Sequence, residues 1–316
     1  MDSRIRLSLV IPCRDKSDPK LQDLLRSIEM QDFPKSDVET LVITEGTSES
    51  AKAIGIRKAR GDVIGILASD NELHDEHFLS EVTRPLFELP WLTGSYPGNY
   101  SVGKGLDALG RYFCRIGGND PLSYYMGKND RFPQGVWPGG LKKRGDYTIQ
   151  YFQRDNTPSI GDNGFFIRKS IIEESDLDNY FHIDNSYDEV IKGNDSYAIV
   201  RQRIVHNTGG NIFSFFAKRY RYGLQHAFNK NRRWHLVDFR QPQDIWRLIC
   251  FILFTLTLVQ PLSLSLRGYR KIQDVAWFIH PVACLLTLVT YTALIIHLGL
   301  RNLFQSSSAL MVAQRA

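Results

Sequence analysis

Residues 65–76, GILASDNELHDE, carry an apolar run that stops at three polar side chains, Asp70, Asn71 and Glu72. Such a cluster either leads an ordinary strand into a solvated loop or binds a divalent cation. Asp70 and Glu72 lie two residues apart in backbone that we expect to be extended or turned, so both carboxylates can face one ion. Carboxylate oxygens suit Mg²⁺ or Mn²⁺. The pattern favours the cation site, with Asp70 and Glu72 as its ligands.

The elements around this cluster read as an α/β sheet. Apolar, β-branched runs predict strands, and spaced apolar positions predict helices, in the order strand 6–12, helix 21–30, strand 38–44, helix 51–59 and strand 63–67. This β-α-β-α-β order predicts a mostly parallel sheet with flanking helices. Ligands bind such sheets beyond the carboxyl ends of the strands, where this chain places polar residues suited to one nucleotide. Farther on, the pattern of residues 180–206 predicts a helix that ends at Gly193 and a strand that ends at His206.

The segment AKAIGIRKARGDVIGILASDN, residues 51–71, resembles the signature of the family 2 glycosyltransferases. Four further stretches resemble the family's motifs in the same order: VIPCRD at 10–15, EGTSES at 45–50, GDNGFFIRK at 161–169, and HID at 182–184 followed by Gly193 and His206. The resemblance covers about residues 5–210. It implies a GT-A fold, with a nucleotide-sugar-binding half (1–92) joined to an insertion and acceptor half (93–210). Such enzymes are usually inverting and metal-dependent.

The resemblance also implies roles for single residues. Asp70 matches the usual metal ligand. Another family carboxylate is replaced by Ala68, which makes Glu72 a candidate substitute. His206 is a candidate for a further metal or phosphate ligand, and Lys52 would offset the charge of a diphosphate. The side chains expected around the base and ribose are Pro12, Arg14, Asp15 and Glu45.

An inverting transfer needs a general base that takes the proton of the acceptor hydroxyl. The acidic pair that supplies it in the family aligns with Phe181-His182, and a later acidic residue of the motif aligns with Asp184. Either His182 is the base, oriented by Asp184, or Asp184 itself takes the proton. We place Asp184 first and His182 second; Asp188, one helical turn later, is the third choice.

Two long apolar stretches without acidic residues, about 245–266 and 275–300, follow this part of the chain. Each is about the roughly 20 residues that cross a bilayer, so we expect two transmembrane helices within 244–301; buried helices of a soluble core are the alternative. Eight Lys or Arg residues lie between Lys218 and Arg247, against three in the loop between the stretches. The positive-inside rule then predicts a hairpin, with the catalytic domain and the tail, 302–316, on the cytoplasmic side.

Residues 211–243 interleave Phe and Tyr with Lys and Arg, which suits the headgroup region of a membrane. The net charge of +5 is concentrated there, which favours anionic lipid over nucleic acid as the partner. Together these features predict a membrane-anchored glycosyltransferase that uses a UDP- or GDP-sugar with Mn²⁺ or Mg²⁺. The expected acceptor is a polyprenyl phosphate or a lipid-linked glycan. An inactive scaffold of the same fold and a membrane-bound nucleotidyltransferase are the alternatives.

Overall fold

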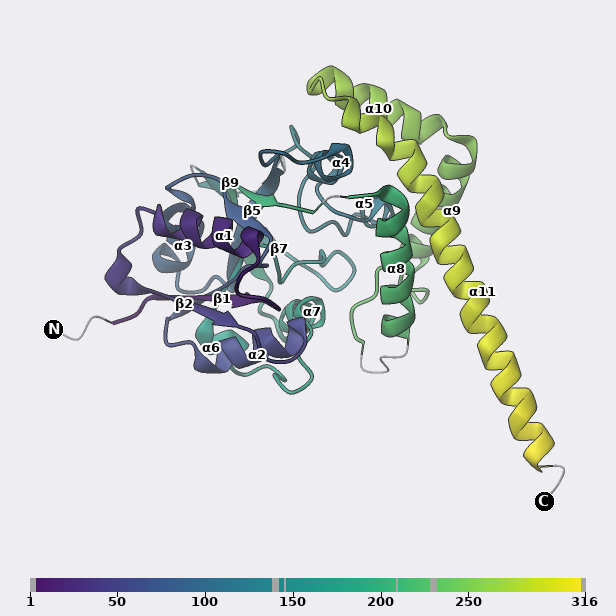
Figure 1. Ribbon diagram of the computed structural model, residues 1–316, viewed down its shortest axis with the longest axis horizontal. Helices are drawn as coiled ribbons and strands as arrows, with labels where there is room; N and C mark the ends of the chain where they lie inside the picture. Colours follow the sequence, from purple (N-terminus) through teal and green to yellow (C-terminus); the bar gives the residue numbers. More distant parts are fainter. Residues whose placement is uncertain (1–3, 138–141, 145, 209, 228–231, 314–316) are drawn as a thin grey trace.

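The computed structural model describes residues 4–137, 142–144, 146–208, 210–227 and 232–313. An α/β domain forms one side of the molecule, and a layer of long helices forms the other (Figure 1). The N-terminus lies on the far side of the α/β domain from the helical layer, which contains the C-terminal helix.

In the described residues, nine strands form one sheet in the order β2-β1-β3-β8-β5-β9-β7-β6, with β4 paired to β9. The strands are β1 (Leu7–Pro12), β2 (Val38–Ile43), β3 (Val63–Ile66), β4 (Asn71–Leu73), β5 (Gly94–Ser101), β6 (Lys142–Arg144), β7 (Tyr147–Tyr151), β8 (Phe165–Arg168) and β9 (Ser196–His206).

The sheet is mixed, so the expectation of a mostly parallel sheet is wrong. The first three strands are parallel, as the β-α-β-α-β pattern predicts. Beyond them only β5 and β9 pair in parallel, whereas β8, β7, β6 and β4 run antiparallel to their partners. The crossover helices that impose parallel pairing occur in the first half of the domain, and short connections such as that between β6 and β7 permit antiparallel pairing.

Helices cover both faces of the sheet. Because side chains alternate along β1, Leu9 and Ile11 pack with α1 (Pro19–Glu29) and α3 (Phe78–Glu88), while Val10 packs with α2 (Ser48–Lys58) on the other face. The same face as α2 carries α6 (Lys169–Ile172) and α7 (His182–Lys192), consistent with the predicted helix closed by Gly193. The expected strand ending at His206 is β9.

The helical layer joins the α/β domain through the insertion. Its helices are α4 (Ala108–Ile116), α5 (Pro121–Met126), α8 (Ile212–Ala227), α9 (Pro242–Thr257), α10 (Val259–Lys271) and α11 (His280–Ala313), with a 3₁₀ turn at Val275–Ile279. Two apolar clusters hold it together, one around Tyr112, Phe216 and Trp277 and one around Met126, Phe251 and Cys284. The α4 and α5 helices of the insertion therefore form part of the helical layer.

The structure does not show the predicted hairpin of two transmembrane helices. The first apolar stretch divides into α9 and α10, which meet at an angle of 83°. The bend lies at Leu258, whose φ is +58°, and Pro261 follows, which has no N–H for a continuous helix and whose ring would crowd the carbonyl of residue 257. Within the described residues one helix, Val275–Arg301, is long and apolar enough to cross a membrane, or two if the bent pair counts as one span.

The predicted cytoplasmic tail begins inside a helix, because α11 continues to Ala313. Residues 314–316 of that tail, and residues 228–231 of the predicted interfacial segment, lie outside the described residues.

Candidate functional site

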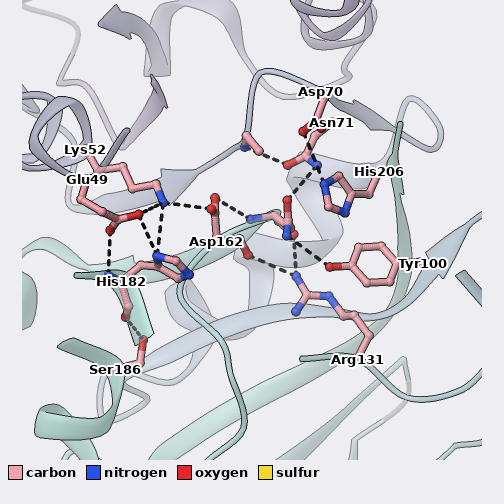
Figure 2. A network of polar contacts seen from close by, with 12 residues as sticks. Glu49, Lys52, Asp70, Asn71, Tyr100, Arg131, Asp162, His182, Ser186 and His206 are labelled. Atoms are coloured by element: carbon pink, nitrogen blue, oxygen red, sulfur yellow. Dashed lines mark hydrogen bonds and ion pairs between the residues drawn. The ribbon is translucent and has the colours of Figure 1, made fainter. Parts of the chain in front are cut away.

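The candidate site lies at one edge of the sheet. The carboxyl ends of β1, β2, β3, β5 and β9 meet there, together with the beginning of β8, because β8 runs antiparallel to β3 and β5. Figure 2 shows the polar side chains that gather at this edge in one connected network.

Lys52 is the centre of one half of the network. It lies on α2, its side chain is 1% exposed, and its Nζ donates to Glu49 Oε1 and to Asp162 Oδ2, both at 2.9 Å. Burial raises the pKa of the Glu49 carboxyl, but the contact with His182 and the charge of Lys52 outweigh it and hold that pKa far below its ordinary value. Burial lowers the pKa of Lys52, and the two carboxylates more than reverse this. Both ions therefore stay charged at neutral pH.

His182, the first residue of α7, joins this cluster. Its backbone N–H donates to Glu49 Oε2 at 3.0 Å, and its Nδ1 lies 3.0 Å from Glu49 Oε1 and 3.3 Å from Lys52 Nζ. The Nε2 atom makes no hydrogen bond to another described residue. An Nδ1–H that donates to Glu49 leaves Nε2 free to accept a proton.

A strained turn supplies Asp162. In the sequence GDNG, Gly161, Asn163 and Gly164 have φ values of +121°, +55° and +81°. A Cβ on Gly161 would lie 2.5 Å from the carbonyl oxygen of His182, so glycine lets the turn approach α7. Burial raises the pKa of the Asp162 carboxyl, and the charge of Lys52 outweighs burial, so that the pKa lies below its ordinary value.

Asp70 and His206 form the other half of the polar network. β4 and β9 pair so that Asn71 lies opposite His206, which brings Asp70 Oδ1 to 3.5 Å from His206 Nε2. Burial raises the pKa of Asp70, but the charge and hydrogen bond of His206 outweigh it and lower that pKa to about 2. Burial lowers the pKa of His206, and the Asp70 carboxylate raises it above its ordinary value.

The two halves are joined through amide side chains. Asn71 accepts a hydrogen bond from the backbone N–H of Ala68 at 2.9 Å and donates to Asn163 Oδ1 at 3.1 Å. Asn163 in turn donates to the hydroxyl of Tyr100 at 3.2 Å, and its carbonyl accepts from Arg131 at 2.5 Å. Because Asn163 follows Asp162 in the chain, the two halves are connected through the GDNG turn.

The donor atoms of Asp70 and His206 fit two positions around one divalent cation. A carboxylate oxygen and an imidazole nitrogen that face each other suit Mn²⁺ better than Mg²⁺, which rarely takes nitrogen ligands. Glu72 does not complete a three-ligand group, since the described residues contain no cluster of three His, Cys, Asp or Glu side chains that could hold a metal. Along β4 it alternates with Asn71 and Leu73, which are buried. Substrate phosphate oxygens would have to supply further ligands.

The residues expected around the nucleotide lie at the same edge but make few contacts. Pro12 is buried at the end of β1, while Arg14, Asp15 and Glu45 are exposed. Their roles stay predictions. Lys52 differs from the expectation of a cation facing a diphosphate, because it is buried between two carboxylates.

Asp184 does not face the network. Its side chain is 2% exposed and accepts a hydrogen bond from the backbone N–H of Trp234 at 2.9 Å, and it pairs with Arg232 Nε at 3.3 Å. Asp188, one turn later, pairs with Arg233 at 2.6 Å. These contacts attach residues 232–234 to α7. Of the three bases that the sequence offered, His182 has the best-placed free atom.

A cavity of about 500 Å³ lies between α2 and the segment that leads into α7. Glu49, which accepts a hydrogen bond from Lys52, and Phe181, which precedes His182 in the chain, both line this cavity. Its volume falls within the range of roughly 300–1,000 Å³ typical of ligand sites. Its charged lining residues are three carboxylates, Glu49, Asp178 and Asp184, and one arginine, Arg57.

Several residues of the network were not selected from the sequence. Glu49 lies in EGTSES and Asp162 and Asn163 lie in GDNG, so the motifs that carry the resemblance contained the signal. Tyr100 and Arg131 lie in the insertion, where neither spacing nor motif pointed to them.

Comparisons with known proteins give a weak likeness of fold. No family model matches the sequence, and no curated protein matches it. Similar solved structures include S. aureus TarS 1–349 in complex with UDP-GlcNAc, which is 13% identical with a TM-score of 0.44 over 92% of this chain and 90% of that one. The mannosyltransferase PcManGT from Pyrobaculum calidifontis, in complex with GDP-Man and Mn²⁺, is 12% identical with a TM-score of 0.45 over 90% and 86%. Against a longer crystal structure of S. aureus TarS, the match covers 72% of this chain and 41% of that one, at 12% identity and a TM-score of 0.42. At this level of similarity, function has to be argued from the site.

Proposed function

We propose that this protein transfers a sugar from a nucleoside-diphosphate sugar to an acceptor hydroxyl, with inversion at the anomeric carbon. The observation that carries the proposal is the network itself, in which an imidazole with a free nitrogen lies beside a carboxylate-bound lysine and is connected to an Asp–His pair at the same sheet edge.

His182 is the general base of the proposed reaction. Its Nδ1–H donates to Glu49, and its Nε2 takes the proton of the acceptor hydroxyl. Around it lie one cation, Lys52, and two anions, Glu49 and Asp162. The group carries one net negative charge while the imidazole is neutral, and a proton on His182 brings it to neutrality. Asp184, by contrast, is bound to the backbone of residue 234.

Asp70 and His206 would hold Mn²⁺, which supplies positive charge beside the diphosphate as the glycosidic bond breaks. Pro12, Arg14, Asp15 and Glu45 would bind the base and the ribose at the neighbouring strand ends. Lys52 acts through Glu49 and Asp162, because burial between them keeps it from the diphosphate.

The acceptor would enter through the cavity beside His182. Its carboxylates can accept hydrogen bonds from sugar hydroxyls, which a bare phosphate lacks. This favours a lipid-linked glycan over a bare polyprenyl phosphate. A lipid-linked acceptor also fits the apolar helical layer, which would attach the protein to the cytoplasmic face of a membrane.

The test is a donor assay with a panel of UDP- and GDP-sugars, Mn²⁺, and lipid-linked glycans or polyprenyl phosphates as acceptors. Transfer to a glycan is expected, with the product of inverted anomeric configuration by NMR. His182→Ala should reduce transfer by about 10²–10⁴-fold. The matched control is Asp23→Asn, an exposed site on α1.

The outcomes separate the alternatives. Full activity of Asp70→Ala with Mn²⁺ would refute the metal assignment. Full activity of His182→Ala would mean that Asp184, and not His182, is the general base. No turnover of any donor with any acceptor would favour an inactive scaffold.

A further inference from the structure

The first apolar stretch begins and ends on the α/β domain and its insertion. At its beginning, Asp244 accepts a hydrogen bond from Lys128 at 2.6 Å, and this ion pair is buried. At its end, Asp274 pairs with Arg115 at 2.9 Å and with Arg111 at 3.3 Å, both on α4. A transmembrane helix would separate its ends by the roughly 30 Å of the hydrocarbon core. The α9–α10 pair instead returns to the side from which it left.

The last helix is also attached to this side along most of its apolar length. Tyr291 donates to Asp120 at 2.5 Å, and Arg219 of α8 pairs with the same carboxylate at 2.6 Å. Farther along α11, His297 Nδ1 lies 2.8 Å from the hydroxyl oxygen of Tyr220 on α8. Figure 1 shows α8 between the α/β domain and α11, and running beside α11. A bilayer placed across α11 would therefore enclose the Asp120–Arg219 pair and the charged residues of α8, which hydrocarbon disfavours.

Each long helix nevertheless leaves one apolar face uncovered. The exposed residues recur at helical spacing on α11 (Val282, Leu285, Val289, Ile296, Leu300), on α9 (Ile245, Ile249, Leu253, Leu256) and on α10 (Val259, Leu262, Leu266, Tyr269). The other faces of these helices pack on α4, α5 and α8 or on one another. Basic side chains are exposed on two helices of this layer: Lys218 and Arg221 on α8, and Arg267, Arg270 and Lys271 on α10.

We infer that the protein is monotopic, and that α9, α10 and α11 lie in the plane of an anionic lipid surface without crossing the bilayer. Apolar helix faces with neighbouring basic residues are what an interface of acyl chains and anionic headgroups accepts. The α/β domain, the end of α10 with the residues up to Asp274, and the end of α11 then all remain on one side of the membrane. This deepens the membrane attachment proposed above.

The test is a labelling experiment on the full chain in phosphatidylglycerol-containing vesicles. Vesicles with the α/β domain outside are captured through an N-terminal affinity tag. A membrane-impermeant maleimide then probes one cysteine at a time, either Arg270→Cys in the last turn of α10 or a cysteine appended after residue 316. Cys13, Cys114 and Cys284 are buried, so only the half-buried Cys250 is replaced, by alanine.

The three topologies give three results. Both cysteines labelled without detergent support the monotopic arrangement. A protected cysteine at position 270 with a labelled tail would mean a hairpin, and a labelled cysteine at position 270 with a protected tail would mean a single span through α11; either overturns the inference. Because labelling does not depend on catalysis, its failure is distinguishable from failure of the proposed reaction.

A second measurement tests the charge of the surface. Arg270→Gln with Lys271→Gln should weaken binding to phosphatidylglycerol vesicles by about fivefold per residue, or about 25-fold together. Arg26→Gln, on the opposite part of the molecule, is the control and should not change binding. Equal binding to neutral and anionic vesicles would contradict the role of the basic residues.

Discussion

Removal of the Glu49 charge is the sharpest test of the proposed base. Glu49→Gln keeps the size of the side chain but replaces one carboxylate oxygen by an amide that donates. In the native site the carboxylate accepts from His182 N, from His182 Nδ1 and from Lys52 Nζ at 3.0, 3.0 and 2.9 Å. The glutamine side chain carries no negative charge. Its amide NH₂ group would face an N–H of His182 or the Lys52 ammonium, which are donors that the carboxylate accepts from. The His182 ring is therefore held less firmly, and Lys52 keeps only Asp162 as a charged partner.

The size of the effect follows from these contacts. A hydrogen bond to a charged group contributes about 1.5–3 kcal/mol, so loss of one such bond to the base corresponds to a factor of about 10–150 in kcat. We expect kcat to fall within this range with little change in the KM for the donor, because Glu49 contacts the base. Transfer assays of wild type and variant over a range of donor concentrations give both kcat and the KM for the donor.

A double-mutant cycle shows whether Glu49 acts through His182. The combined Glu49→Gln and His182→Ala variant should be no slower than His182→Ala alone. The control is Glu173→Gln, at the C-terminal end of α6, whose exposed carboxylate pairs with Lys169 at 3.3 Å. Unchanged kcat in Glu49→Gln, or effects that multiply independently in the cycle, would refute the orientation of His182 by Glu49.

The lowered pKa of Glu49 also predicts how the stability of the fold depends on pH. Its folded-state pKa is depressed below the ordinary value of 4.5, so its stabilisation is present above pH 4.5 and is lost as pH falls toward the folded pKa. Urea unfolding should therefore show a larger loss of stability for Glu49→Gln at pH 7 than at pH 4. A loss that is independent of pH would mean that packing, and not charge, stabilises this position.

Two further predictions concern the rest of the network. Asp70→Asn should lower the pKa of His206, followed by NMR of the imidazole, because burial remains while the carboxylate is gone. Since the His206 pKa is raised in the folded state, its pairing stabilises fully below 6.5 and is lost as pH rises through that pKa, so the variant should lose more stability at pH 6 than at pH 9. An unchanged titration would contradict the pairing. Gly161→Ala should destabilise more than Gly193→Ala, which adds a Cβ in open space at φ +97° and costs only the strain of about 1–2 kcal/mol; equal losses in urea unfolding would contradict the close approach to His182.

The residues at the strand ends could be predicted because the signals are local. The alternation of strands and helices over residues 6–67 was sufficient to predict three parallel strands and the polar ends of β1, β2 and β3. The motif at residues 51–71 likewise selected Lys52 and Asp70, and both lie in the network. The order of the later strands did not follow, because antiparallel pairing of β7 and β8 depends on partners far away in the chain.

The choice of base and the topology of the helices needed the tertiary structure. The sequence places Asp184 ahead of His182 as the base, and the contact of Asp184 with the backbone of Trp234, fifty residues later, favours His182 instead. Hydropathy likewise marked residues 245–266 as a span, but it could not show that Asp274 returns to Arg115 on α4. The sequence by itself determined which chemical groups stand at the ends of strands, since side-chain type and local periodicity are written in neighbouring residues. The tertiary structure decided which groups are paired and which are free, because ion pairing and burial depend on residues that only folding brings together.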